Sequence, residues 1–403
     1  MGVRRSSRRS KGRATLSLCF VLFLAGAALG AESRFSISPY FDTGYSDNIF
    51  WDRSRVGDLI LSPGLDVDFG TNSWKLFLNA DGQVYRDNDY LNSILVSGGA
   101  SFFKVFSPRT SLFVSPEFSL TRYSDSVSFL DTAVPGITIG VKHALSARVF
   151  SRVGLGLRYS NYLNEDSYDR FRLAAFLELS AFLPTQTTLR FTLGMNYLLF
   201  PHIDVASATS TGFPPPLGAG YDTAPHHRPS HSSFPISPSN NEAIVDLALL
   251  QPHVIVRLAQ GLGFKTGIVA EIMYRKNRDP LQGIQALAAS EWTLEQTDED
   301  FFWQGTRFSV GIKTESLLGL EIAVDLAFFK KEYPGIEALD LDGIPIQPLS
   351  YRSDSLAQAN AHLAKKLRTF SLYVNAGYRH NKSNDLYFQY DLYTISGGVE
   401  FSI

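Results

Sequence analysis

The chain has 403 residues with 37 Lys plus Arg and 39 Asp plus Glu, a single cysteine and 13% aromatic residues. A formal net charge of −2 leaves no basic excess for nucleic acid, and one cysteine excludes an intramolecular disulfide. No nucleic-acid partner is therefore expected.

The N-terminal 30 residues have the pattern of a secretory signal peptide. Residues 1–13 carry six basic residues and no acid, residues 14–30 are apolar or small, and Ala28, Leu29 and Gly30 before Ala31 fit a small-residue cleavage site. We predict a Sec-type signal peptide over residues 1–30 rather than a retained membrane anchor. Its removal takes six basic residues and Cys19, which leaves about 373 residues with a formal charge of about −8.

No segment after residue 30 has the pattern of a membrane-spanning helix. The most apolar run, Leu317 to Phe329, is interrupted by Glu321 and Asp325. An exported chain with many aromatic residues, no further cysteine and no such helix favours an outer-membrane β-barrel. We therefore predict an all-β fold for residues 31–403: one transmembrane antiparallel up-and-down barrel of about 16 strands.

The chain after residue 30 divides into segments in which apolar and polar residues alternate. The first expected strand is about 35–45, followed by a polar loop with Asp47 and Asn48. The second is about 59–69, and after a tight turn at 70–73 the third runs from 74 to 85. Short turns are expected on the periplasmic side and long loops, including 87–92, 124–135, 161–169, 201–241, 276–300 and 334–350, on the extracellular side.

Prolines interrupt four of the expected strands. Pro39, Pro63, Pro116 and Pro252 would each remove a ladder hydrogen bond, so we interpret them as sites of β-bulges. A soluble β-sandwich also alternates, but sixteen strands without a second compositional zone favour the barrel.

Tyrosines end the strands that are expected to run outward. A tyrosine places its ring in lipid and its hydroxyl among the headgroups, so this regularity predicts an interface girdle. The opposite strand ends favour Phe and Trp, such as Phe35 and Trp74. The predicted girdle consists of Tyr45, Tyr85, Tyr123, Tyr159, Tyr197, Tyr274, Tyr333 and Tyr378.

The last stretch, 386–403, is expected to close the barrel. From Tyr393 onward every second residue is apolar or small, which predicts a strand with Ile395, Val399 and Phe401 outside and Glu400 inside. A terminal strand needs a partner for its edge, so we expect antiparallel pairing with the strand at 35–45.

Two segments resemble a porin-2-like family of outer-membrane β-barrel porins from Gram-negative bacteria. The segment Ser38 to Phe50, SPYFDTGYSDNIF, is similar to their first strand and loop. The segment from Asn384, with Tyr387-x-x-Tyr390-Asp391 and Gly397-Gly398-Val399-Glu400-Phe401, is similar to their closing hairpin. The resemblance implies a passive channel in the cell outer membrane, in contact with outer-membrane lipid and lipopolysaccharide, inserted by the barrel-assembly machinery. It is compatible with a homotrimer.

The positions between the apolar ones are predicted to line a water-filled lumen. The first five strands would contribute an acidic set: Asp42, Asp66, Asp68, Asp81 and Glu117. The next four would contribute a basic set: Lys142, Arg152, Arg158, Arg172 and Arg190. Later strands are mixed, with Arg257 and Glu271 among them. These sets would either place a field across the water or pair locally and stiffen the wall.

The 201–241 segment is the longest expected loop. Pro214, Pro215 and Pro216 exclude regular structure, and the loop would either fold into the mouth or cover the surface. His226, His227 and His231 are spaced like metal ligands, but no carboxylate or scaffold accompanies them, so no metal or cofactor is expected.

The leading functional hypothesis is a diffusion channel for small hydrophilic solutes. The alternative is the outer-membrane component of an exopolysaccharide or capsule export system, which a track of inward aromatic residues would favour. An adhesive or structural barrel is a third class. An enzyme is not expected, because no Gly-x-Ser-x-Gly element is present and His253 and His362 have no evident nucleophile beside them.

Overall fold

The computed structural model describes residues 34–164, 169–204, 244–263, 265–278, 303–316, 318–341, 345–346, 348 and 350–401. The predicted signal peptide and most of the 201–241 loop, with His226, His227 and His231, lie outside the described residues. Within the described part, no helix is both long enough and apolar enough to cross a membrane.

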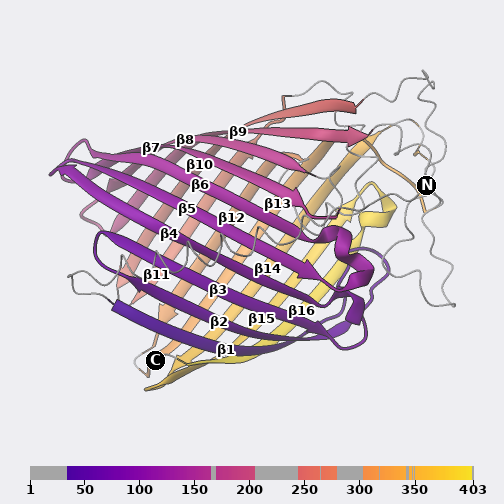
Figure 1. Ribbon diagram of the computed structural model, residues 1–403, viewed down its shortest axis with the longest axis horizontal. Helices are drawn as coiled ribbons and strands as arrows, with labels where there is room; N and C mark the ends of the chain where they lie inside the picture. The colour runs from indigo at the N-terminus through magenta and orange to yellow at the C-terminus, as the bar shows by residue number, and fades with distance from the viewer. Residues whose placement is uncertain are drawn as a thin grey trace, which may run out of the picture.

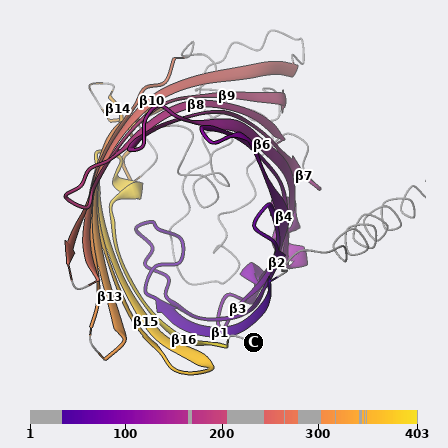
Figure 2. The same ribbon diagram turned by 90° about the vertical axis from the view of Figure 1, so that its left-hand side faces the viewer.

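Sixteen antiparallel strands form a single closed barrel, which confirms the predicted fold class (Figures 1 and 2). Each strand pairs with its neighbours in the chain. The strands are β1 (Arg34–Ser46), β2 (Asp58–Gly70), β3 (Trp74–Tyr85), β4 (Ser93–Ser107), β5 (Thr110–Tyr123), β6 (Thr132–Ala144), β7 (Val149–Tyr162), β8 (Arg170–Phe182), β9 (Thr187–Asp204), β10 (Ile244–Gly263), β11 (Thr266–Arg275), β12 (Gln304–Glu315), β13 (Leu320–Glu337), β14 (Tyr351–Lys366), β15 (Phe370–Ser383) and β16 (Tyr390–Phe401).

The first and last strands close the barrel as the sequence predicts. β1 pairs antiparallel with β16, with Phe41 opposite Val399 and Tyr45 opposite Ile395. The ladder runs from Tyr40 to Ser46 of β1, so the two terminal strands satisfy the backbone of this stretch in one another.

The two faces of the sheet differ in chemistry. Large apolar side chains such as Phe41, Leu155 and Ile395 are 46%, 56% and 57% exposed, and they share one face through the register. We call this the outer face and the opposite one the inner face. A continuous exposed apolar band of this kind is costly in water and is typical of a hydrocarbon-facing surface.

The two ends of the barrel also differ. At one end, strands are joined by tight turns, such as residues 71–73 and 367–369. At the other, longer connections contain the 3₁₀ helices η1 (Asp89–Leu91), η2 (Asp125–Leu130) and η5 (Leu386–Phe388), which gather at the right of Figure 1. We call this second end the mouth.

The four strand prolines do not form bulges, so that interpretation was wrong. Pro39 is opposite Leu65, Pro63 opposite Phe41, Pro116 opposite Ile137 and Pro252 opposite Met195, and no register shift occurs at any of them. All four lie on the outer face. The ladder tolerates a missing donor because both neighbouring strands hold the register on either side.

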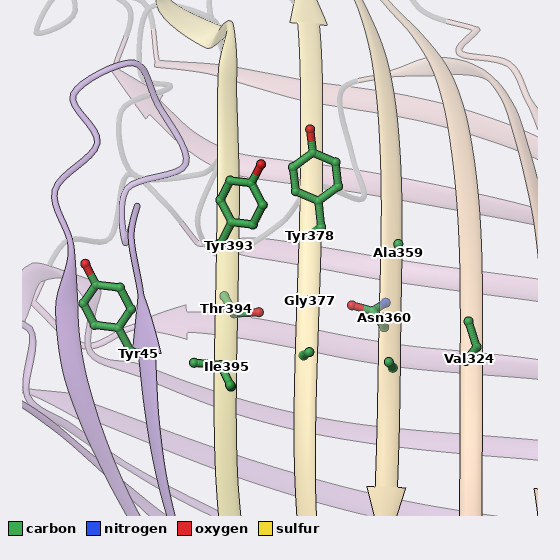
Figure 3. A pocket seen from close by; sticks show the side chains of 11 residues that line it. Tyr45, Val324, Ala359, Asn360, Gly377, Tyr378, Tyr393, Thr394 and Ile395 are labelled. Atoms are coloured by element: carbon green, nitrogen blue, oxygen red, sulfur yellow. The ribbon is translucent and has the colours of Figure 1, made fainter.

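Five of the eight predicted girdle tyrosines lie on the outer face: Tyr45, Tyr159, Tyr197, Tyr274 and Tyr378. Figure 3 shows Tyr45, Tyr378 and Tyr393 around an apolar groove of about 480 Å³ on this face. The other three need correction. Tyr85 and Tyr123 share the inner face with Asp81 and Glu117, and Tyr333 is buried under Arg352. Tyr85 and Tyr123 have the strand parity of Asp81 and Glu117, so they face inward.

Candidate functional site: the inner wall of the barrel

The predicted acidic residues lie on the inner face, each beside an uncharged neighbour. Across the ladder, Asp42 is opposite Ser62, Asp66 opposite Asn79, Asp68 opposite Phe77, Asp81 opposite Gly64, and Glu117 opposite Gly99. No two of these carboxylates are directly opposite one another. We call β1–β5 the acidic wall.

Partners within the acidic wall are few. Lys75 Nζ lies 2.8 Å from Asp68 Oδ1, and Asn79 Nδ2 donates to Asp66. Asp81 has no hydrogen bond or ion pair to any described residue, and one oxygen of Asp42 is buried without a hydrogen-bond partner there. Several carboxylates of this wall therefore keep their charge largely uncompensated.

The predicted basic residues lie on the same inner face, in β6–β9, and three pairs of cations are directly opposite one another. Lys142 is opposite Arg152, Arg158 is opposite Arg172, and Arg190 is opposite Arg257 of β10. Like charges in this position repel and destabilise a sheet. We call β6–β10 the basic wall.

Three of these cations contact aromatic rings or an amide. The guanidinium of Arg152 lies 4.1 Å from the ring centroid of Phe113 and 5.3 Å from that of Phe176. Lys142 Nζ lies 4.6 Å from the Phe150 centroid. Arg172 donates from Nε and Nη2 to Asn196 Oδ1, at 3.2 and 3.1 Å. Cation–π contacts position the guanidinium without neutralising it.

Three carboxylates do reach the basic wall. Glu117 of β5 forms an ion pair with Arg158 of β7 across Gly136 of β6, so the two predicted sets meet there. Glu178 lies 3.7 Å from Arg190 Nε and is directly opposite Arg152. Glu271 of β11 is directly opposite Arg257. Three acids thus serve six cations, and the wall keeps a net positive charge.

Glycines under the inward rings form a feature that the sequence reasoning missed. Each of six inner-face rings lies over the glycine directly opposite it, so that a Cβ there would come within 2.1–2.7 Å of ring atoms. The pairs are Tyr40 and Gly64, Phe77 and Gly99, Phe113 and Gly140, Phe176 and Gly154, His253 and Gly194, and Tyr373 and Gly398. A ring that covers a strand glycine restores packing that the glycine lacks.

The two remaining histidines of interest have structural surroundings. His253 lies over Gly194, and His362 shares a 2.6 Å hydrogen bond with Asn375 and stacks on Tyr373. No group of three metal-binding side chains occurs among the described residues.

The first connection, residues 47–57, closes the seam at the mouth. Asn48 is fully buried and donates from Nδ2 to Asp52 O at 2.6 Å. Asp47 accepts from Tyr393 N at 2.6 Å, and Arg55 lies 3.2 Å from Asp391. The Asp-Asn of the resemblance motif therefore joins the first loop to the last strand. Elsewhere at the mouth, burial and the nearby Asp58 raise the pKa of Tyr90 in η1 to about 12.

No family model and no curated protein matches the chain. Among solved structures, it is similar to OccAB1 of Acinetobacter baumannii (8% identity, TM-score 0.45), with 92% of this chain and 96% of that chain covered. It is also similar to OpdO of Pseudomonas aeruginosa (9%, TM-score 0.47, 92% and 97% covered). The outer membrane protein OpdK of Pseudomonas aeruginosa gives 10% identity and a TM-score of 0.47, with 92% and 99% covered. Identities this low describe a likeness of fold alone.

Proposed function

We propose that the protein is an outer-membrane channel through which small hydrophilic solutes diffuse passively. Two properties of the barrel support the proposal. A closed barrel of sixteen strands is too wide for side chains to fill and encloses an aqueous lumen, and its outer face carries the apolar band that a bilayer requires.

The observation that carries the proposal is the set of opposed cations on the inner wall. Lys142 with Arg152, Arg158 with Arg172, and Arg190 with Arg257 repel one another across the ladder. A structural wall gains nothing from this arrangement, whereas a passing anion relieves the repulsion. The lumen therefore favours small anions over cations along β6–β10.

The location and partners follow from the same proposal. Residues 1–30 direct export as a Sec-type signal peptide, and residues 31–403 insert in the outer membrane through the barrel-assembly machinery. The outer face contacts outer-membrane lipid and lipopolysaccharide, and a homotrimer is the assembly to test first.

One observation favours a second function, export of a polysaccharide. Tyr40, Phe77 and Tyr373 lie on the inner face over glycines, and aromatic rings on a channel wall offer surfaces on which sugars stack. These rings belong to β1, β3 and β15, away from the basic wall.

Single-channel recording in a planar bilayer tests the proposal. The protein purified from the outer membrane of an expressing host should show discrete, long-lived openings and should let small neutral sugars equilibrate into liposomes. A barrel that passes no current would contradict the channel and leave the adhesive class. Long current blockades by neutral oligosaccharides, absent with short sugars, would favour polysaccharide export instead.

A further inference from the structure

Three connections at the mouth are joined to one another by backbone hydrogen bonds. Arg53 N of the 47–57 connection donates to Tyr387 O at 3.3 Å, and Leu386 N donates to Leu339 O at 3.1 Å. The β1–β2, β15–β16 and β13–β14 connections therefore form one continuous layer. We call residues 47–57, 384–389 and 338–341 together the mouth shelf.

The mouth shelf packs on the inner face of the barrel and not on its rim. The guanidinium of Arg352 lies 3.4 Å from the ring centroid of Phe388, and the backbone carbonyl of Phe388 accepts from Asn381 Nδ2 at 2.7 Å. Arg352 and Asn381 are both inner-face positions of their strands. In the end-on view of Figure 2, the yellow η5 and the purple loop after β1 accordingly lie within the ring of strands.

Buried polar groups hold the mouth shelf in place. Asp385 is fully buried, and its carboxylate accepts from Tyr387 N at 3.0 Å and from Leu339 N at 3.3 Å. Arg352 and Asp354 form a buried ion pair at 2.7 Å beneath Phe388. Interactions of this kind are costly to break, which makes the shelf a fixed part of the wall.

Trp51 is the side chain of the 47–57 connection that reaches the inner wall. The Arg379 guanidinium lies 4.3 Å from its ring centroid. The backbone of Trp51 has a φ of 55°, which is unfavourable for a bulky residue and persists only where the surroundings require it. The strained position places the indole inside the mouth.

The mouth shelf lies opposite the basic wall. In the ring of sixteen strands, the β16–β1 seam is eight strands from the β8–β9 pair in either direction. The mouth shelf therefore faces Arg158 and Arg172, which lie toward the mouth ends of β7 and β8, across the barrel.

We propose that the mouth shelf is the selectivity constriction of the channel, with Trp51 as its specificity-determining residue. It narrows the mouth from the seam side and forces entering solutes against the arginines of the basic wall. This inference rests on the proposed channel function. The β1–β2 and β15–β16 connections, the first and last of the barrel, thus build most of the constriction. They lie side by side because β1 pairs with β16.

Cysteine modification at position 51 tests the inference, because the only other cysteine is Cys19 in the predicted signal peptide. In the Trp51→Cys variant, an uncharged bulky thiol reagent added during recording should remove about half or more of the single-channel current. Lys365→Cys, on the exposed outer face of β14, is the matched control and should keep its current. Wild type treated in the same way reports any contribution of Cys19.

Two further variants keep the inference testable without a thiol. Trp51→Ala should raise the conductance and weaken the preference for anions, since solutes no longer pass close to the arginines. Asn48→Ala removes the buried hydrogen bond from Asn48 Nδ2 to Asp52 O in the shelf. It should also raise the conductance and weaken the preference for anions, with noisier openings. Unchanged current in modified Trp51→Cys, together with unchanged selectivity in Trp51→Ala, would overturn the constriction while leaving the channel intact. Absence of current in wild type would instead contradict the channel itself.

Discussion

The acidic and basic walls differ in the residues that lie directly opposite their charged side chains. In β1–β3 every inward carboxylate is opposite uncharged residues only, and the single nearby lysine, Lys75, pairs with Asp68. In β6–β10 three pairs of cations are directly opposite one another. Three of these six cations contact neutral groups: Lys142 contacts Phe150, Arg152 contacts Phe113 and Phe176, and Arg172 contacts Asn196. The acidic wall avoids like-charge contacts, and the basic wall maintains them. In the proposed channel, the positive charge of β6–β10 acts on the lumen and not on the stability of the sheet.

Reversing the basic wall should give the largest effect. In a variant with Arg152→Glu, Arg158→Glu and Arg190→Glu, the zero-current potential under a KCl gradient should change sign, from anion to cation preference, because six units of charge change along one path. Lys365→Glu on the outer face is the control and should leave the potential unchanged. An unaltered potential in the triple variant would mean that these arginines do not face the permeation path.

Displacing the Phe176 ring that contacts Arg152 should give the next largest effect. In Gly154→Leu the new side chain occupies the space of the Phe176 ring, so we expect a loss of about 1–3 kcal/mol in unfolding free energy and a weaker anion preference. Urea unfolding in lipid bilayers and zero-current potentials measure the two.

Gly156→Ala provides the matched control on the same strand and face. A Cβ there would meet Thr138 Oγ1 at 3.5 Å, an ordinary contact. Equal destabilisation by both substitutions would contradict the specific role of the ring over Gly154.

Neutralising the acidic wall should act more weakly and in the opposite direction. Asp81→Asn removes a carboxylate that has no partner among the described residues, so anion preference should rise slightly. Asp68→Asn should change it less, since Lys75 already balances that charge. If both substitutions leave the potential unmoved, the acidic wall lies outside the ion path.

The smallest effect is expected for Lys75→Ala. The side chains of Lys75 and Asp68 are 58% and 42% exposed, and exposed ion pairs contribute about 0–1 kcal/mol to stability. Urea unfolding should therefore place this variant within about 1 kcal/mol of wild type. A larger loss would indicate that the acidic wall depends on Lys75 for its fold.

The strand alternation was sufficient to predict the barrel. Because a strand has a period of two, the parity of Phe41, Val399 and Glu400 in the sequence already assigns them to faces, and the register of β1 with β16 agrees. The same parity assigns Asp66 and Arg152 to the inner face. Parity also shows that Tyr85 and Tyr123 face inward, but the regular spacing of tyrosines at strand ends obscured this.

The cross-strand neighbours could not be predicted, because they depend on registers between strands. Arg158 and Arg172 become opposite one another only once β7 and β8 are aligned. The positions of the Phe113 and Phe176 rings over Gly140 and Gly154 depend on two such alignments, of β5 with β6 and of β7 with β8. Likewise, the contacts of the 47–57 connection with residues more than 300 positions away could not be predicted. The predicted loop at 201–241 lies mostly outside the described residues and stays a prediction.

The zero-current potential of the wild-type channel in a KCl gradient tests the central claim most directly. The account predicts a potential of the sign set by chloride, larger at low ionic strength, where exposed charges are less screened. A potential set by potassium, or one that is zero at every salt concentration, would contradict a lumen in which the basic wall governs passage.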